Sequence, residues 1–280
     1  MTYDSARWDG FVPRDDDVFI CTPPKCGTTW TAAICAFLIF GRTDGDIKPG
    51  MICPWLDGKS MPLGEMKAML STQTHRRFIK THTPLDGVPY FRQCTYLTVY
   101  RDPRDMYFSM RGHAANLKSE KLAHRLTANI GDGFRDWVEK PFAPGDFDAF
   151  ALGSNVHHYQ SYKRHADLPN VHFFHYADMK RDLRGAVTGM AAALEIAPSD
   201  ALVDDIVAAT GFDAMKANAG KFAPNAGRGV WKDDSQFFNS GQSQQWREAL
   251  SGDDLAVYDA RLAALLTESD IAWLHNGGGA

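Results

Sequence analysis

The sequence has few cysteines, and no pair of them is spaced to hold a metal. Its 280 residues include five cysteines, an odd number, and no CxxC pattern occurs. Such a set fits neither a disulfide framework nor a zinc site. Unpaired thiols are typical of a reducing compartment, so we expect a cytoplasmic protein without a bound metal.

The sequence also lacks a run of apolar residues that could cross a membrane and an excess of positive charge. The longest apolar run, Trp30 to Phe40, is far shorter than a ~20-residue transmembrane helix and predicts a buried helix. The N-terminal stretch MTYDSARWDGFVPRDDD shows no signal-peptide pattern. A formal net charge of −4 argues against a broad surface for nucleic acid or anionic lipid. We therefore expect no nucleic-acid or membrane partner, and any anion site must be local.

Four stretches rich in β-branched and aromatic residues alternate with stretches of helical character. The four stretches are Val18 to Cys21, Arg77 to Thr81, Thr95 to Tyr100 and Val171 to Tyr176. This alternation predicts an α/β fold with a central parallel β-sheet flanked by helices on both faces. No internal repeat or linker divides the chain, so we expect residues 1–280 to form a single domain.

Helix starts and irregular segments complete this outline. Asp102-Pro103 is typical of an N-cap followed by the first helical residue, and Ser251 with Asp254 fits a capping box. Residues 42–61 and 217–240 contain long stretches without helical or strand periodicity, and 217–236 in particular is expected to be a loop. Irregular segments of that length are commonly lids or binding loops, so both are candidate lid or acceptor loops.

The stretch TPPKCGTTW, residues 22–30, joins the first predicted strand to the buried helix. A helix start presents free backbone N–H groups and a positive dipole end, which favour a phosphate-like anion. Lys25 adds a cation, and Thr28 and Thr29 add hydroxyl donors. The Walker A pattern is not met because the lysine precedes the glycine, which disfavours an ordinary ATPase or kinase. An ordinary strand-to-helix turn with an exposed lysine remains the competing interpretation.

Two further segments place charged residues at predicted strand ends. In RFIKTHTP, Lys80 and His82 share one side of a strand and suit general-base work beside an anion, although a histidine is often structural. In YLTVYRDPRDMYFSM, Arg101 closes a strand and Ser109 follows on a helix, which suits phosphate binding. We expect Arg104 and Asp105 to form an ion pair.

These three segments, in this order, resemble the cytosolic sulfotransferases that use 3′-phosphoadenosine-5′-phosphosulfate (PAPS). TPPKCGTTW is similar to the family's TYPKSGTTW, which binds the 5′-phosphosulfate, with Pro24 for Tyr and Cys26 for Ser. KTHTP is similar to KTHLP, so the resemblance implies that His82, Lys80 and Lys25 are catalytic. It also implies a P-loop-like domain, PAPS as the sulfuryl donor and adenosine 3′,5′-bisphosphate (PAP) as the product.

The resemblance further implies a set of nucleotide-binding residues. YRDPRDMYFS is similar to YRNPRDxxVS, a 3′-phosphate motif, while HYADMKRD and TGFDAMKAN are similar to YEDMKxx and TSFxxMKxNP, which lie near the adenine. The residues implied to bind the cofactor in these motifs are Lys25, Cys26, Gly27, Thr28, Thr29, Trp30, Arg101, Ser109, Tyr176, Thr210 and Phe212. Taken alone, the aromatic residues of this set would be expected in the core.

The family's last phosphate loop, RKGxxGxWK, has two possible counterparts, AGRGVWKDD and FFNSGQSQQWREAL. The second fits better because the spacing of Trp246, Leu250 and Tyr258 matches the helix that follows this loop in the family. Asn239, Ser240 and Gly241 are then implied to bind the 3′-phosphate. Both cations of the family's Arg-Lys pair are then missing. Arg228 on the preceding loop is a candidate replacement.

The implied reaction is in-line sulfuryl transfer to a hydroxyl or amine of a small acceptor, with His82 as the general base. Apolar or aromatic acceptors are expected if Trp8, Phe11, Trp55, Phe108, Phe134, Trp137 and Phe142 line the pocket rather than the core. The alternatives are a P-loop kinase of a small metabolite and a PAP-binding protein without catalysis. An exposed Cys26 beside Lys25 would also be open to oxidation. A monomer and a homodimer are both compatible with the sequence.

Overall fold

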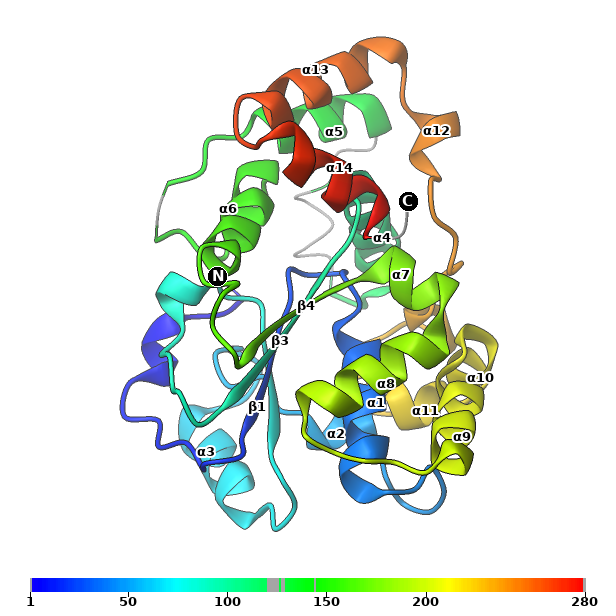
Figure 1. The fold of residues 1–280 in the computed structure, drawn as a ribbon. Coiled ribbons are helices and arrows are strands. Elements are labelled where there is room, and N and C mark those ends of the chain that lie inside the picture. The colour runs from blue at the N-terminus through cyan, green and yellow to red at the C-terminus, as the bar shows by residue number, and fades with distance from the viewer. Residues whose placement is uncertain (1, 120–125, 127–128, 144, 279–280) are drawn as a thin grey trace.

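The computed structural model describes residues 2–119, 126, 129–143 and 145–278 (Figure 1). At its centre four parallel strands pair in the order β2-β1-β3-β4. The strands are β1 (Val18–Cys21), β2 (Phe78–Thr81), β3 (Thr95–Tyr100) and β4 (Val171–His175). All four predicted strands are therefore present, and the predicted parallel arrangement is confirmed.

Helices connect the strands and surround the sheet. The longer helices are α1 (Thr28–Phe40), α3 (Leu63–Thr72), α4 (Pro103–Asn116), α5 (Ile130–Glu139), α6 (Leu152–Lys163), α8 (Leu183–Ala193), α9 (Asp200–Thr210), α13 (Gly252–Ala263) and α14 (Glu268–Asn276). The shorter ones are η1 (Ser5–Trp8), α2 (Pro49–Ile52), η2 (Leu85–Gly87), α7 (Tyr176–Arg181), α10 (Phe212–Ala217), α11 (Ala219–Phe222), η4 (Ser235–Phe237) and α12 (Trp246–Ala249). No helix in the described part of the chain is long and apolar enough to cross a membrane.

The central strand β1 is buried on both faces. Its alternate residues point to opposite sides of the sheet, as the period of a strand requires. Val18 and Ile20 pack into the core formed with α1, α8 and α9, whereas Phe19 and Cys21 pack into the core formed with η1 and α3. Figure 1 shows these helices on the two sides of the sheet. The expected cover on both faces is confirmed.

The expected helix boundaries are found as well. Helix α1 begins after Gly27 and ends at Gly41, both with left-handed backbone, at φ 111° and φ 65° respectively. Asp102 caps α4 by accepting a hydrogen bond from the backbone N–H of Arg104, and Ser251 with Asp254 forms the capping box of α13. Local sequence alone therefore predicts where these helices start.

The expectation that residues 217–236 form a loop is only partly right. Helix α11 lies inside this segment, and its Phe222 side chain is buried against Phe37 of α1, with ring centroids 6.0 Å apart. Helix α2 lies inside the segment 42–61 and packs so closely on α11 that a Cβ on Gly50 would stand 2.5 Å from the Phe222 carbonyl oxygen. Tertiary contacts, rather than a periodic pattern, stabilise these single-turn helices.

The topology explains where a ligand can bind. Connections from β1 and β3 lead to opposite sides of the sheet, so their carboxyl ends diverge and leave a crevice. Each strand end supplies one predicted site residue, namely Lys25 after β1, His82 after β2, Arg101 after β3 and Tyr176 after β4. The fold thus brings together residues that are far apart in the sequence.

Candidate active site

A cavity of about 680 Å³ lies at the carboxyl edge of the sheet. The four strand-end residues line it, and so do residues of α4 and α6. Both candidate loops contribute to its wall, 42–61 through Trp55 and Ser60 and 217–240 through residues such as Trp231 and Phe237. The two segments therefore stay candidate lid or acceptor loops.

The loop before α1 has a backbone shaped for an anion. Lys25 has a left-handed backbone at φ 67°, which is uncommon for a residue with a side chain, and Gly27 follows at φ 111°. A Cβ on Gly27 would stand 3.3 Å from the Tyr176 ring and 3.6 Å from Val99, so a side chain there would press on the tyrosine as well as strain the backbone. The first hydrogen bond of α1 runs from the Thr31 N–H to the Gly27 carbonyl, so the N–H groups of Thr28, Thr29 and Trp30 have no partners within the helix, and all three residues line the cavity.

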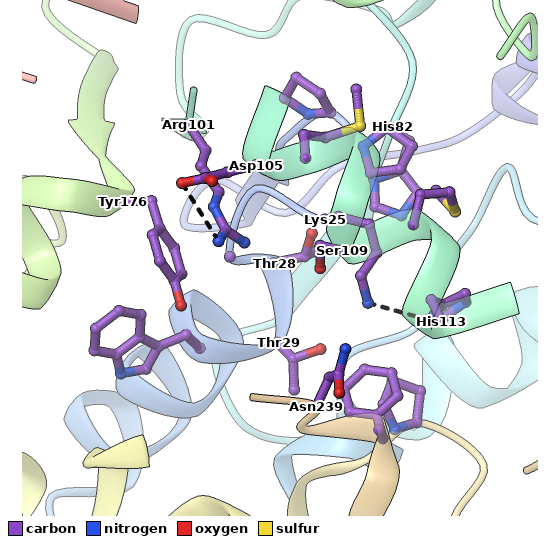
Figure 2. A pocket seen from close by; sticks show the side chains of 18 of the residues that line it. Lys25, Thr28, Thr29, His82, Arg101, Asp105, Ser109, His113, Tyr176 and Asn239 are labelled. Carbon is purple, nitrogen blue, oxygen red and sulfur yellow. Dashed lines mark hydrogen bonds and ion pairs between the residues drawn. The ribbon is translucent and has the colours of Figure 1, made fainter. Parts of the chain in front are cut away.

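The Lys25 side chain is held by a histidine that the sequence analysis did not single out. Its Nζ lies 3.0 Å from Nδ1 of His113 on α4 and 5.0 Å from the ring centre of Phe237 (Figure 2). Burial, and then the charge of Arg101, lowers the pKa of Lys25 to about 8. Burial and the charge of Lys25 also lower the pKa of His113 well below its ordinary value, so a neutral His113 accepts a hydrogen bond from the ammonium group.

His82 is oriented by the backbone of the neighbouring strand connection. Its Nδ1 lies 2.7 Å from the Thr22 carbonyl oxygen, which can only accept, so Nδ1 carries the proton and Nε2 has the free lone pair. Burial, reinforced by the charges of Lys80 and Lys25, lowers the pKa of His82 to about 4. The imidazole is therefore neutral at physiological pH, the state that a general base requires.

Lys80 precedes His82 on β2 and lines the same cavity. Burial lowers its pKa, and no carboxylate in the described residues lies within 4.0 Å of its ammonium group or that of Lys25. Two half-buried cations without anionic partners, lining one cavity, favour an anionic ligand there.

Arg101 marks a second cationic region of the cavity. Its guanidinium lies 4.4 Å from the ring centre of Tyr176, and its Nη2 is 3.8 Å from a carboxylate oxygen of Asp105. Ser109 lies two turns further along α4 and also lines the cavity (Figure 2). The Nε atom of Arg101 is buried without a hydrogen-bond partner among the described residues, so part of its donor capacity is unused.

The residues expected near an adenine all line the cavity. Trp30 and Tyr176 pack edge to face with ring centroids 5.5 Å apart, and Phe212 is 37% exposed. Thr210 also lines the cavity but is buried, and its hydroxyl donates to the Ile206 carbonyl oxygen 2.7 Å away. Aromatic side chains are therefore available at the cavity wall, whereas the Thr210 hydroxyl is already hydrogen-bonded within α9.

Comparison with known proteins identifies the family. The model of the sulfotransferase domain matches residues 15–270. The chain belongs to this family and is a sulfotransferase. A glycolipid sulfotransferase of Mycobacterium bovis is 35% identical over 304 residues, which cover 98% of this chain and 92% of the relative. Human sulfotransferase 1E1 is 30% identical over 230 residues, covering 75% of this chain and 71% of the relative.

Solved structures show the same fold. Mouse sulfotransferase SULT7A1 complexed with PAP superposes with a TM-score of 0.72 at 24% identity, over 95% of this chain and 89% of that one. Retinol dehydratase in complex with androsterone and PAP superposes with a TM-score of 0.75 at 21% identity, over 95% of this chain and 84% of that one. At these identities the likeness establishes the architecture alone.

One predicted cofactor residue of this sulfotransferase does not face the cavity. Cys26 is fully buried in the core formed with α4, α5 and α13, and its backbone N–H donates to the Pro23 carbonyl oxygen. Burial raises the pKa of its thiol to about 12, although Arg101 and Lys25 act in the opposite direction. The expectation of an exposed, readily oxidised thiol is therefore wrong.

Two expected cationic contacts are also wrong. Arg104 pairs with Asp102 at 2.8 Å rather than with Asp105, because Asp102 is the helix cap and Asp105 lies one turn from Arg101. Arg228 is exposed and is not among the residues that line the cavity, so it is not placed to replace the missing Arg-Lys pair. Asn239, Ser240 and Gly241 do line the cavity.

The aromatic residues divide between pocket and core. Of the expected pocket residues, Trp55, Phe108 and Phe142 line the cavity. The others, Trp8, Phe11, Phe134 and Trp137, pack in the hydrophobic cores. Phe147, Phe150, Trp231 and Phe237 line the cavity without having been predicted. Whether an aromatic residue lines the cavity or packs in a core depends on where it lies in the fold, and its residue type does not predict this.

Proposed function

We propose that this sulfotransferase transfers a sulfuryl group from PAPS to a hydroxyl, or an amine, of an acceptor with an apolar part, and that His82 is the general base. The observation that supports this most is the bond from His82 Nδ1 to the Thr22 carbonyl, 2.7 Å long, because it leaves Nε2 free beside two lysines. A protein that only binds PAP has no use for an oriented, neutral imidazole.

The residues present fit such a donor. Lys25 and the first turn of α1 offer a cation and amide donors for a phosphosulfate, while Arg101, with its unused Nε, and Ser109 offer donors for a phosphate. Trp30, Tyr176 and Phe212 offer aromatic surfaces for a base. When bound, PAPS supplies an activated sulfonate, which carries less charge than a phosphoryl group.

The side chains near the reacting group have separable roles in this proposal. His82 Nε2 accepts the proton of the acceptor hydroxyl, and Nδ1 stays bonded to Thr22 throughout. Lys25 offsets negative charge on the leaving phosphate side and Lys80 offsets charge on the sulfonate oxygens. Since His113 holds Lys25 before the ligand arrives, little reorganisation of this lysine is needed during the reaction.

The proposed acceptor follows from the cavity wall and from the relatives. The aromatic side chains of Trp55, Phe108, Phe142, Trp231 and Phe237 suit an apolar or aromatic portion. The 35% identical mycobacterial relatives are named glycolipid sulfotransferases, so a glycolipid hydroxyl should be tested beside simple phenols, alcohols and amines. The five buried, unpaired thiols support a reducing, cytoplasmic setting.

Calorimetry with PAP, followed by transfer of labelled sulfate from PAPS to an acceptor panel, tests the proposal with wild type and His82→Asn. We expect both proteins to bind PAP with similar affinity, and the variant to lose roughly 10²- to 10⁴-fold in kcat. Binding of PAP without transfer to any acceptor would favour the binding protein. Turnover of ATP with Mg²⁺ in place of PAPS would favour the kinase, and His82 would then be unexplained.

A further inference from the structure

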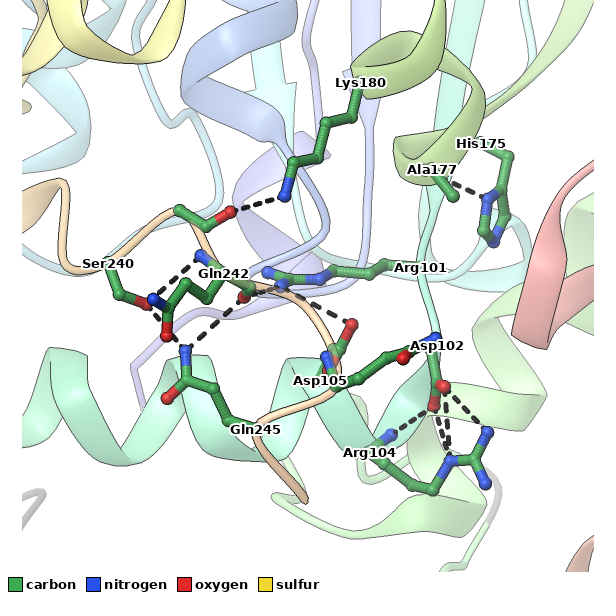
Figure 3. A network of polar contacts seen from close by, with 12 residues as sticks. Arg101, Asp102, Arg104, Asp105, His175, Ala177, Lys180, Ser240, Gln242 and Gln245 are labelled. Carbon is green, nitrogen blue, oxygen red and sulfur yellow. Dashed lines mark hydrogen bonds and ion pairs between the residues drawn. The ribbon is translucent and has the colours of Figure 1, made fainter. Parts of the chain in front are cut away.

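The loop 239–242 contains no cationic side chain, yet three cations hold it. Lys216 Nζ lies 2.9 Å from the Asn239 carbonyl oxygen, Lys180 Nζ 2.8 Å from that of Gly241, and Arg101 Nη2 3.3 Å from that of Gln242. Figure 3 shows Lys180 and Arg101 reaching the loop from different elements. Positive charge is therefore present at this loop, but it comes from outside it.

Lys180 and Arg101 belong to one cluster at the cavity. Lys180 follows Tyr176 by four residues on α7, so the two side chains share a helix face. The Tyr176 ring in turn lies under the Arg101 guanidinium, 4.4 Å from it. Both cations line the cavity, as do Ser109 and Ser240. The cluster thus combines two cations with two hydroxyl groups.

The charges of the two cations are not equally available. Asp105 lies 3.8 Å from Arg101 and offsets part of its charge. Lys180 is exposed, and no carboxylate in the part of the chain that the structure describes lies within 4.0 Å of its Nζ. A phosphate monoester carries a charge of about −1.5 to −2 at neutral pH, which a partly neutralised arginine does not balance.

We propose that Lys180 binds the 3′-phosphate of the nucleotide and supplies the positive charge that the loop 239–241 lacks. This inference rests on the proposed function. A charge-assisted bond to a phosphate is roughly twice as strong as a bond to a neutral carbonyl, so Lys180 exchanges the Gly241 carbonyl for the ligand. Its exposed, flexible stem allows this movement without unfolding the helix.

Lys216 provides a matched control within the same protein. It makes the same kind of contact, from Nζ to a carbonyl of the same loop, but it is not among the residues that line the cavity. Its ammonium lies over the Phe212 ring, 5.9 Å from the centre. Holding the loop and binding the phosphate can therefore be separated experimentally.

The experiment compares the affinities of wild type, Lys180→Met, Lys180→Arg and Lys216→Met for PAP and for adenosine 5′-monophosphate, which lacks the 3′-phosphate. We expect Lys180→Met to weaken PAP binding by roughly 10- to 100-fold, the range for one charged hydrogen bond. Its affinity for the monophosphate should stay within about twofold of wild type. Lys180→Arg should restore most PAP affinity, and Lys216→Met should affect both ligands alike.

Three results would overturn the inference. An unchanged PAP affinity of Lys180→Met would remove Lys180 from the site. Equal losses for PAP and the monophosphate would make Lys180 a loop-holding residue like Lys216. Failure of the wild-type protein to bind PAP would reject the proposed function itself, and the inference with it. Thermal unfolding of each variant verifies that the fold is intact.

Discussion

The two ends of the cavity are built differently. At the end proposed to hold the sulfonate, here called the sulfonate end, Lys25, Lys80 and His82 are positioned by strand ends, by a left-handed backbone and by a hydrogen bond from the imidazole to a carbonyl. At the end proposed to hold the 3′-phosphate, here called the phosphate end, the long side chains of Arg101 and Lys180 donate hydrogen bonds to carbonyls of residues 241–242. Rigidity is thus concentrated where bonds are proposed to form, while the binding end can exchange partners when the ligand arrives.

Two glycine substitutions, one at each end of the cavity, test this contrast, and we expect them to have the largest effects. Gly27→Ala places a Cβ on a backbone at φ 111°, which residues with a side chain rarely adopt, and 3.3 Å from the Tyr176 ring. We expect it to lower the free energy of unfolding by about 2–3 kcal/mol. Gly241→Ala sits at φ 64°, and the Phe212 ring that it meets at 2.8 Å is partly exposed and can move. We expect a loss of only about 1 kcal/mol there, with weaker PAP binding.

Chemical denaturation and PAP titration of both variants measure the difference. Gly64→Ala on α3 is the control, because its Cβ would meet nothing within 4 Å and should stabilise the helix by about 0.5–1 kcal/mol. Equal losses of stability for Gly27→Ala and Gly241→Ala would contradict the view that the sulfonate end is the rigid one.

The pH at which His82 takes up a proton tests the sulfonate end separately. Its pKa of about 4, well below the ordinary 6.5, follows from burial and from Lys80 and Lys25. The neutral form exists above the pKa, so the fraction of free base should not change between about pH 8 and 5.5. An NMR titration of the histidine rings should show this, with the proton on Nδ1, and His82→Asn assigns the resonance. A midpoint near 6.5 would mean that the ring is hydrated and that the lysines do not act on it.

The sulfonate end could be predicted from the sequence because each part of it is local. A strand, a turn with Lys25 and Gly27, and a helix start lie within one short stretch, and His82 directly follows the strand that carries Lys80. Alternation of apolar stretches then predicted the parallel sheet that brings these segments together. Local patterns of this kind report directly on backbone geometry.

The phosphate end could not be predicted in the same way because its contacts depend on tertiary structure. Lys180 and the carbonyl of Gly241 are 61 residues apart, and nothing in the spacing of either indicates the other. His113 likewise meets Lys25 across 88 residues. The pairing of Arg104 with Asp102 shows the same limit at short range, since the sequence does not tell which of the two neighbouring arginines pairs with which of the two neighbouring aspartates.

The smallest effect is expected at Cys26, where this chain has a cysteine in place of the serine of the resembling motif TYPKSGTTW, a difference that suggests redox sensitivity. The thiolate is the species that reacts with peroxide, and burial raises the pKa of this thiol to about 12. Peroxide should therefore leave PAP affinity and sulfate transfer unchanged in wild type and in Cys26→Ser alike. Since all five cysteines are buried, a thiol reagent should label none of them until the protein is unfolded. Loss of activity in wild type that Cys26→Ser resists would show that the loop opens far enough to expose the sulfur, and the sulfonate end would then not be rigid.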